Sequence, residues 1–241
     1  GGVSEATSER SMASFLAKKT KQALLIDLDP QANATSGLGL YDNAFSNSTY
    51  EALLGSINPN KAIYPTTTRN LSIMPSTKDL SGAEIELVSE FNRERFLKNM
   101  IEALDKKYEI IIIDCPPSLG LLTINALTAS TEIIIPVQSE YYALEGLARL
   151  MQTIDSVKTA LNPSLKIQGV LITMYDKRLG LSKQVDEEAR SHLGDLVFGT
   201  VIPRNVKLSE APGFGEPISK YDKKSKGAKA YKNLAKELLN G

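Results

Sequence analysis

The chain has 241 residues, of which 42% are hydrophobic and 23% are charged. These proportions suit one sizeable core and exclude fibrous, disordered and disulfide-stapled proteins. Lys plus Arg and Asp plus Glu each number 28, so any contact with nucleic acid must come from a local patch. The single cysteine, Cys115, excludes an internal disulfide and a cysteine-rich metal or iron–sulfur site, which fits a reducing cytosol.

Membrane segments are not expected, and we predict a cytoplasmic protein with no membrane partner. No run approaches the ~18 apolar residues needed to span a bilayer, and the amino terminus lacks a charged-then-apolar signal. The pattern over 226–239 is amphipathic and fringed with lysines. A docked terminal helix explains that pattern better than a helix on a membrane surface.

Four short, continuously apolar runs predict strands that are buried on both faces of a parallel sheet. The runs are 23–26, 109–113, 132–137 and 168–173. Helical patterns lie between or after them, at 93–107, 142–158 and 226–239. This alternation predicts βαβ units, and 58–69 reads as a polar excursion between elements. We therefore expect one α/β domain over 1–241, with a mainly parallel, twisted sheet and helices on both faces.

Carboxylates follow two of these apolar runs. Asp27 and Asp29 come after the first, and a small, Gly-containing loop extends from them to Gly39. Asp114 ends the second run, where the aspartate of a Walker B strand would hold Mg²⁺. Ligands of parallel sheets sit beyond the carboxyl ends of the strands, which makes these residues candidates for a site. An aspartate at a strand end is also a common turn residue.

Four segments together resemble the ParA/Soj family of chromosome- and plasmid-partition ATPases, within the wider group that includes MinD and the nitrogenase iron protein. They are LIDLDPQ (25–31), IDCPPSLG (113–120), PVQSEYYALEG (136–146) and IPRNVKLSEAP (202–212). The nitrogenase branch is disfavoured because its shared cluster needs cysteines that this chain lacks. MinD is disfavoured by the same four segments and by the weak membrane signal at the carboxyl end.

The resemblance implies a P-loop NTPase fold of the ParA/MinD type that binds ATP or ADP with Mg²⁺. It implies that Asp29 is catalytic, positioning or activating the attacking water, and that Asp27 and Asp114 serve the metal. The implied nucleotide-binding residues are Gly1, Gly2, Thr7, Pro203 and Asn205. The implied DNA-binding residues are Arg178, Lys183 and Lys207. Without the resemblance, these three cations would be taken for ordinary solvated surface.

The implied partners are nonspecific double-stranded DNA, a ParB/Spo0J-type protein and a second copy in a homodimer. The implied location is the cytoplasm of a bacterium, in association with the nucleoid.

The phosphate loop departs from the family pattern, in which Lys-Gly-Gly-x-Gly-Lys-[Ser/Thr]-Thr cradles phosphates at a helix start. Aligned without gaps from Asp27, the loop here reads GGVSEAT over 1–7. Ser4 replaces a glycine, Glu5 replaces the phosphate lysine and Ala6 replaces the Mg²⁺-binding hydroxyl. The family's preceding strand and signature lysine have no counterpart in this sequence.

Two functional hypotheses follow from this departure. The first is a partition ATPase that dimerises on ATP, coats nucleoid DNA and is stimulated to hydrolyse by its ParB-type partner. The second is a hydrolysis-deficient relative that keeps the fold for binding DNA or a partner. The segment 1–21 discriminates between them, because it carries the altered loop.

Overall fold

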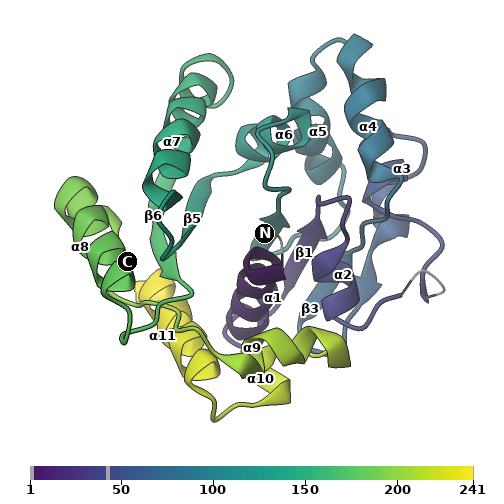
Figure 1. Ribbon diagram of the computed structural model, residues 1–241. Helices are drawn as coiled ribbons and strands as arrows, with labels where there is room; N and C mark the ends of the chain where they lie inside the picture. The colour runs from purple at the N-terminus through teal and green to yellow at the C-terminus, as the bar shows by residue number, and fades with distance from the viewer. Residues whose placement is uncertain (1–2, 42–43, 241) are drawn as a thin grey trace.

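The computed structural model describes residues 3–41 and 44–240, with side chains described within 9–41 and 44–239. It is an α/β structure in which most strands run parallel (Figure 1). The strands are β1 (Ala23–Asp27), β2 (Tyr64–Pro65), β3 (Leu71–Met74), β4 (Ile110–Asp114), β5 (Glu132–Gln138) and β6 (Lys166–Thr173). The first helices are α1 (Val3–Ala17), α2 (Asn33–Gly37), α3 (Thr49–Leu53), α4 (Leu80–Glu86), α5 (Phe96–Glu102) and α6 (Leu121–Ala129). The later helices are α7 (Ala143–Ala160), α8 (Gly180–Leu193), α9 (Val206–Glu210), α10 (Ile218–Tyr221) and α11 (Lys226–Asn240).

The strands of the described residues hydrogen-bond in two groups. One sheet has the order β2-β3-β1-β4, in which β1 lies parallel to both β3 and β4 and β2 lies antiparallel to β3. The other sheet consists of β5 and β6 in parallel. Since α6 connects β4 to β5 in a βαβ unit, the carboxyl ends of both sheets face the same edge.

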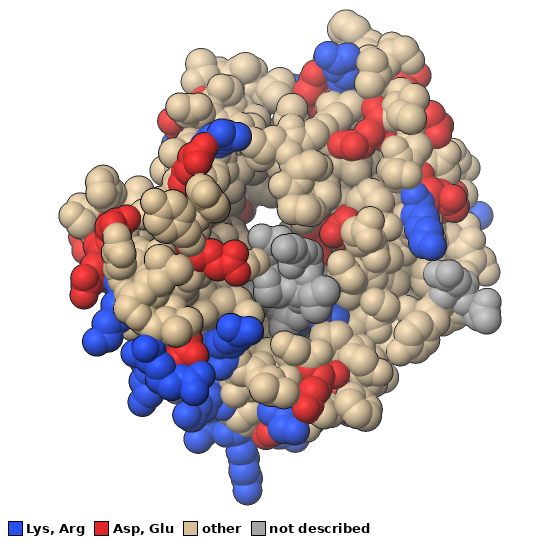
Figure 2. Space-filling model, in the orientation of Figure 1, with Lys and Arg blue, Asp and Glu red and all other residues tan. Residues whose placement is uncertain are grey.

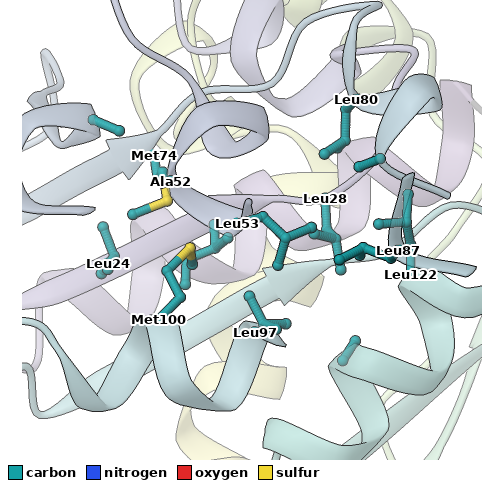
Figure 3. Packing of buried hydrophobic residues seen from close by; sticks show 14 residues of the cluster. Leu24, Leu28, Ala52, Leu53, Met74, Leu80, Leu87, Leu97, Met100 and Leu122 are labelled. Atoms are coloured by element: carbon teal, nitrogen blue, oxygen red, sulfur yellow. The ribbon is translucent and has the colours of Figure 1, made fainter. Parts of the chain in front are cut away.

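Helices cover both faces of the larger sheet, which explains why β1 is apolar along its length. On one face Leu24, Ile26 and Leu28 pack with α3, α4, α5 and α6, and Figure 3 shows Leu28 among Leu53, Leu87 and Leu122. On the other face Leu25 packs with α1, α2 and α11. Every residue of β1 is buried. Burying a Leu or Ile side chain stabilises the fold by ~1.5–3 kcal/mol, so β1 anchors the sheet.

A second core surrounds the smaller sheet. Ile135 and Val137 of β5 and Val170 and Ile172 of β6 pack with α7 and α8. Leu171 faces the other way, toward α9, α10 and α11. The fully buried Tyr231 is the largest side chain of that cluster, and α11 packs along α1. The terminal helix is thus docked on the protein, as its pattern predicted.

Four predicted strands are confirmed as β1, β4, β5 and β6, and the mainly parallel α/β fold is confirmed with them. Strands β2 and β3 were not predicted, and β2 lies inside the excursion over 58–69. The helix expected over 93–107 is shorter, because a 3₁₀ turn (Arg93–Arg95) precedes α5 and α5 ends at Glu102. The Asn60 side chain accepts from Asp105 N at 3.0 Å, which holds the chain in a turn there.

We predict that Asn125 fixes α5 against α6. Its amide is fully buried, accepts from Leu97 N at 3.1 Å and donates to Arg93 O at 2.8 Å. Asn125→Leu should lower the free energy of unfolding by about 2–4 kcal/mol, because buried polar groups lose their partners. Asn99→Leu, at an exposed position of α5, should change it by less than about 0.5 kcal/mol. Equal urea midpoints for the two variants would contradict this role.

Candidate functional site

Three carboxylates lie together at the carboxyl edge of the larger sheet. Asp27 and Asp114 end β1 and β4 and are directly paired in the parallel register. Asp29 follows two residues later, and its charge acts on Asp114. Asp27, Asp114 and Asp29 are 0%, 3% and 5% exposed. Ionised carboxylates are almost never buried without partners, so this cluster identifies the edge as a candidate site.

Asp27 has its hydrogen-bond partners within the chain. Its Oδ2 accepts from Thr35 Oγ1 at 2.6 Å and from Thr35 N at 2.8 Å. Its Oδ1 accepts from Asp29 N at 3.1 Å. Thr35 Oγ1 accepts in turn from Ser76 N at 2.9 Å. The carboxylate thereby joins the end of β1 to α2 and to the segment after β3.

Burial raises the pKa of Asp27 to about 6, and the hydrogen bonds from Thr35 and Asp29 oppose that rise. The pKa of Asp114 is raised well above its usual range, first by burial and then by the charges of Glu9, Asp27 and Asp29. Among the described side chains, Asp114 Oδ2 is a buried oxygen with no hydrogen-bond partner. An oxygen in that state suits a ligand that brings positive charge, such as hydrated Mg²⁺.

Arg10 brings a positive charge of the chain itself into the cluster. The residue is 4% exposed, and its Nη1 donates to Asn33 O at 3.1 Å. Burial lowers the pKa of Arg10, and the charges of Asp114, Glu9 and Asp27 raise it. A Cβ at position 37 would overlap the guanidinium, so Gly37 makes the room that Arg10 occupies. Arg10 was not predicted as a site residue from the sequence, because one arginine in a helix carries no motif.

The loop after β1 holds Asp29 in a defined place. Asp29 Oδ1 accepts from Gln31 N at 2.9 Å, and Ala32 N donates to Asp29 O at 2.9 Å. Ala32 has a φ of 52°, which is unusual for a residue other than glycine. Such strained backbone gathers at functional sites, where the surrounding structure enforces it.

The structure describes only some of the residues that the resemblance assigns to the nucleotide. Gly1 and Gly2 lie outside the described residues, and so does the side chain of Thr7, whose backbone belongs to α1. Pro203 pairs with Tyr175 just beyond β6, at the same edge as the carboxylates. Asn205 begins α9, which packs against α1, and its Oδ1 accepts from Lys207 N at 3.1 Å. That capping bond uses the amide oxygen of Asn205.

The bridge between Tyr175 and Pro203 brings two cation-bearing segments together. Arg178 is 82% exposed in its side chain and pairs with Asp176 at 2.7 Å. Hydrogen bonds from Arg178 lower the pKa of Asp176 to about 2, and the charge of Arg204 adds to that effect. Arg204 is exposed and was not predicted as a site residue.

The other two predicted DNA-contacting cations are also exposed. Lys207 pairs with Glu210 at 2.8 Å, and Lys183 lies on α8. An exposed ion pair of this kind contributes ~0–1 kcal/mol to stability. A phosphate group can therefore replace the carboxylate beside the cation with little loss of stability.

Further lysines gather beside these segments. Figure 2 shows a concentration of Lys and Arg at the lower left, over the region of α8 and the carboxyl-terminal helices in Figure 1. The exposed lysines before and along α11 are Lys223, Lys224, Lys226, Lys229, Lys232 and Lys236. Burial lowers the pKa of Lys18, and the charges of Lys223 and Lys232 lower it further. The chain has no net charge, yet this surface has a local excess of positive charge.

Residues 3–41 and 44–240 contain neither a ready-made metal cluster nor a membrane-spanning helix. No group of three or more His, Cys, Asp or Glu side chains there could hold a metal ion by itself. A metal at the carboxylate cluster would therefore need further ligands, as Mg²⁺ usually takes from water and phosphate. No helix in the same part of the chain combines the length and apolar character needed to cross a bilayer.

We predict that the hydroxyl of Thr35 keeps Asp27 ionisable. The pKa of Asp27 in the folded protein is about 6, which exceeds the ~3.9 of an aspartate in an unfolded chain. The stabilisation that this difference gives is complete below about pH 4 and is lost as the pH rises through 6. Thr35→Val removes a bond to the charged form and should raise the pKa of Asp27 further. The variant should lose about 2 kcal/mol of stability at pH 7.5 and less at pH 5.

Thr35→Ser keeps the hydroxyl and is the matched control, since it should retain the pH profile of the parent chain. Urea unfolding between pH 4.5 and 8 measures both variants. A loss in Thr35→Val that is the same at every pH would contradict the assignment to Asp27.

The chain is similar to known proteins over nearly its whole length. A family model described as an AAA domain matches residues 1–167. The sporulation initiation inhibitor protein Soj of Bacillus subtilis is 51% identical over 238 residues, which cover 99% of this chain and 94% of that protein. The chromosome partitioning protein ParA of Myxococcus xanthus is 49% identical over 239 residues, covering 99% of this chain and 84% of that protein.

A solved structure shares the fold over the whole chain. Cobyrinic acid a,c-diamide synthase from Mycobacterium smegmatis, solved with bound ADP and magnesium, matches with a TM-score of 0.86 at 36% identity. The match covers 100% of this chain and 90% of that chain. The fold, the paired strand-end carboxylates and the identities with Soj and ParA agree with the family that the sequence segments indicated. The chain belongs to the ParA/Soj family of chromosome-partitioning ATPases.

Proposed function

We propose that this chain is a DNA-partition protein that binds ATP or ADP with Mg²⁺ as a homodimer, associates with nonspecific duplex DNA and responds to a ParB/Spo0J-type partner. The observation that carries the proposal is the buried pair Asp27 and Asp114, with one Asp114 oxygen lacking a hydrogen-bond partner. Family membership supports the rest. The same membership favours action in the bacterial cytoplasm at the nucleoid.

The residues at the carboxylate cluster fit Mg²⁺. Asp114 and Asp27 would hold the ion through its water shell, and Asp29 would orient the attacking water. Bound Mg²⁺ supplies positive charge that offsets charge on the phosphates. Thr7, Pro203 and Asn205 would contact the nucleotide. Because Asp27 is already held by Thr35, binding would draw mainly on the free oxygen of Asp114.

A second candidate function is binding of DNA or a partner without ATP turnover, as in a hydrolysis-deficient member of the family. Glu5 stands where the family has its phosphate lysine, and Ala6 stands where it has a hydroxyl. Arg10 favours this candidate, because it gives the carboxylates a buried counter-charge from within the chain. A lysine ~4 Å from a phosphate is worth roughly 4 kcal/mol at an effective dielectric near 20, so its loss alone costs about a thousandfold in affinity.

The proposed DNA surface combines Arg178, Lys183 and Lys207 with Arg204 and the lysines around α11. All are exposed, and the bridge between Tyr175 and Pro203 draws the segments of Arg178 and Arg204 together. The surface offers long cationic side chains on several elements, which suits backbone phosphates better than the edges of bases. We therefore propose that this surface binds duplex DNA without sequence preference.

We predict that the chain as given binds ATP weakly and hydrolyses it negligibly. Titration calorimetry with ATP and Mg²⁺ should give a dissociation constant well above the micromolar range, and phosphate release should stay at background. Glu5→Lys alone should recover little, because Ser4 and Ala6 still depart from the family's loop. Ser4→Gly, Glu5→Lys and Ala6→Thr, combined with an upstream strand and its lysine, should recover slow hydrolysis that DNA and the ParB-type partner stimulate.

Micromolar affinity and steady turnover by the unaltered chain, on a preparation freed of contaminating ATPases, would contradict the impaired site. Failure of the combined variant to bind nucleotide, while it stays folded by circular dichroism, would contradict the proposed nucleotide function itself.

We predict that Arg178→Glu with Lys207→Glu abolishes binding to random duplex DNA. Each phosphate contact that is lost should reduce the log–log salt slope by about 0.9. Lys78→Glu with Lys98→Glu is the matched control, because it makes the same change in net charge at two exposed sites elsewhere. Fluorescence anisotropy at several salt concentrations measures both. Unchanged binding of the first variant, or equal losses in both, would rule out this surface.

A further inference from the structure

A pocket of about 330 Å³ lies between the start of α7 and the first turns of α8. Both helices belong to the core around the smaller sheet and lie close to each other (Figure 1). Asp27, Asp29 and Asp114 are not among its lining residues, so the pocket is separate from the carboxylate site. Its lining includes Tyr141, Tyr142 and Glu145 at the start of α7, and Leu181, Gln184 and Glu188 of α8.

Two tyrosines form one wall of the pocket and are largely open to solvent. Tyr141 and Tyr142 are 76% and 75% exposed, and their rings pack edge-to-face with centroids 5.1 Å apart. The segment that carries them is fixed to β6, because Thr173 O accepts from Ser139 N at 3.0 Å and from Ser139 Oγ at 2.8 Å. Exposed aromatic rings that are held in place are typical of surfaces that bind a partner.

The charged part of the pocket is acidic. Among the described residues, the charged side chains that line it are Glu145 and Glu188, and no lysine or arginine lines it. Glu145 accepts from the guanidinium of Arg149 at 2.7 Å, and Glu188 accepts from the amide of Gln184 at 2.9 Å. Both contacts are exposed, and another donor can replace such a contact at little cost. Because the faces of tyrosine rings and carboxylates both attract positive charge, the pocket suits a cation.

Exposed leucines at the pocket indicate that its ligand is part of a polypeptide. Leu181 lines the pocket and is 40% exposed, and Leu179, directly before α8, is 49% exposed. A small free cation would leave these side chains in water. A segment of another protein would cover them with apolar side chains next to its cation, and that burial would add to the affinity.

We propose that this pocket anchors an arginine side chain of a partner protein, which binds across the starts of α7 and α8. The guanidinium would stack on a tyrosine ring and donate to Glu145 or Glu188. Arginine suits the pocket better than lysine, because its flat group stacks on a ring while its N–H groups still reach a carboxylate. Apolar residues of the partner beside the arginine would cover Leu179 and Leu181. This inference goes beyond the proposed function, and its test needs neither nucleotide nor DNA.

The test titrates the chain with the peptide acetyl-Gly-Leu-Arg-Leu-Gly-amide and follows methyl signals by NMR. The methyl groups of Leu144, Leu181 and Val185 line the pocket and should shift, whereas those of the exposed Ile85 and Val88 should not. The matched control peptide has citrulline in place of arginine, which keeps the shape of the side chain and removes its charge. The control peptide should bind at least about fivefold more weakly.

Substitutions in the pocket should weaken binding of the arginine peptide. Tyr142→Ala removes a ring and Glu188→Gln removes a negative charge, so each should weaken binding at least about threefold. Glu187→Gln is the matched control, because Glu187 is an exposed residue of α8 that does not line the pocket. It should change binding by less than about twofold. Circular dichroism shows whether each variant is folded.

Four results would overturn the proposal. One is the absence of pocket shifts at millimolar concentrations of the arginine peptide. Another is equal binding of the citrulline peptide, which would indicate an apolar groove. The third is equally tight binding of free arginine amide, which would indicate a site for small cations. The fourth is a set of pocket signals that changes on dilution together with loss of a dimer, which would assign the pocket to a second copy. If a variant fails to fold, the two peptides on the unaltered chain still decide.

Discussion

The two hydrogen bonds from Thr35 hold a fully buried carboxylate at the end of β1. Burying that charge is costly, and each of its oxygens is satisfied by a group from a different part of the loop that follows. Ser76 extends the network to the segment after β3. The position of Asp29 depends on this network, because Asp27 accepts hydrogen bonds from both Asp29 and Thr35, on either side of the loop between them.

The charges at this edge are partly balanced within the chain itself. Asp27, Asp29 and Asp114 are buried close together, and their mutual repulsion contributes to the raised pKa of Asp114. Arg10 offsets part of that repulsion from inside the protein. A guanidinium stays charged at all ordinary pH, so this compensation is permanent and does not wait for a ligand.

The sequence predicted the parts of the fold that are long, apolar and repetitive. β1, β4, β5 and β6 stand out as apolar runs rich in Ile, Leu and Val, and the meeting of Asp27 and Asp114 at the ends of β1 and β4 follows from the geometry of parallel sheets. β3 could not be predicted in the same way, because Leu71–Met74 contains a serine and is only four residues long. Its place beside β1 comes from tertiary pairing, which local pattern does not encode.

Arg10 and the division of the strands into two groups could not be predicted from the sequence, because both depend on contacts between distant segments. The arginine becomes informative only when Gly37, in a different helix, is seen to make room for it. The division of the described strands into two hydrogen-bonded groups is visible only when the strands are placed in space, since each run by itself looks like a complete buried strand. Residue types and spacings define motifs, whereas these two features are relations between distant segments.

Helix α1 carries the charge of Arg10 to the carboxylates while its apolar side chains belong to the core. Leu16 packs beside β1, and α1 packs along α11. Arg10 of the same helix donates to Asn33 O, and its charge acts on Asp114. The place of the Arg10 charge beside the carboxylates therefore depends on how α1 packs against the sheet and against α11.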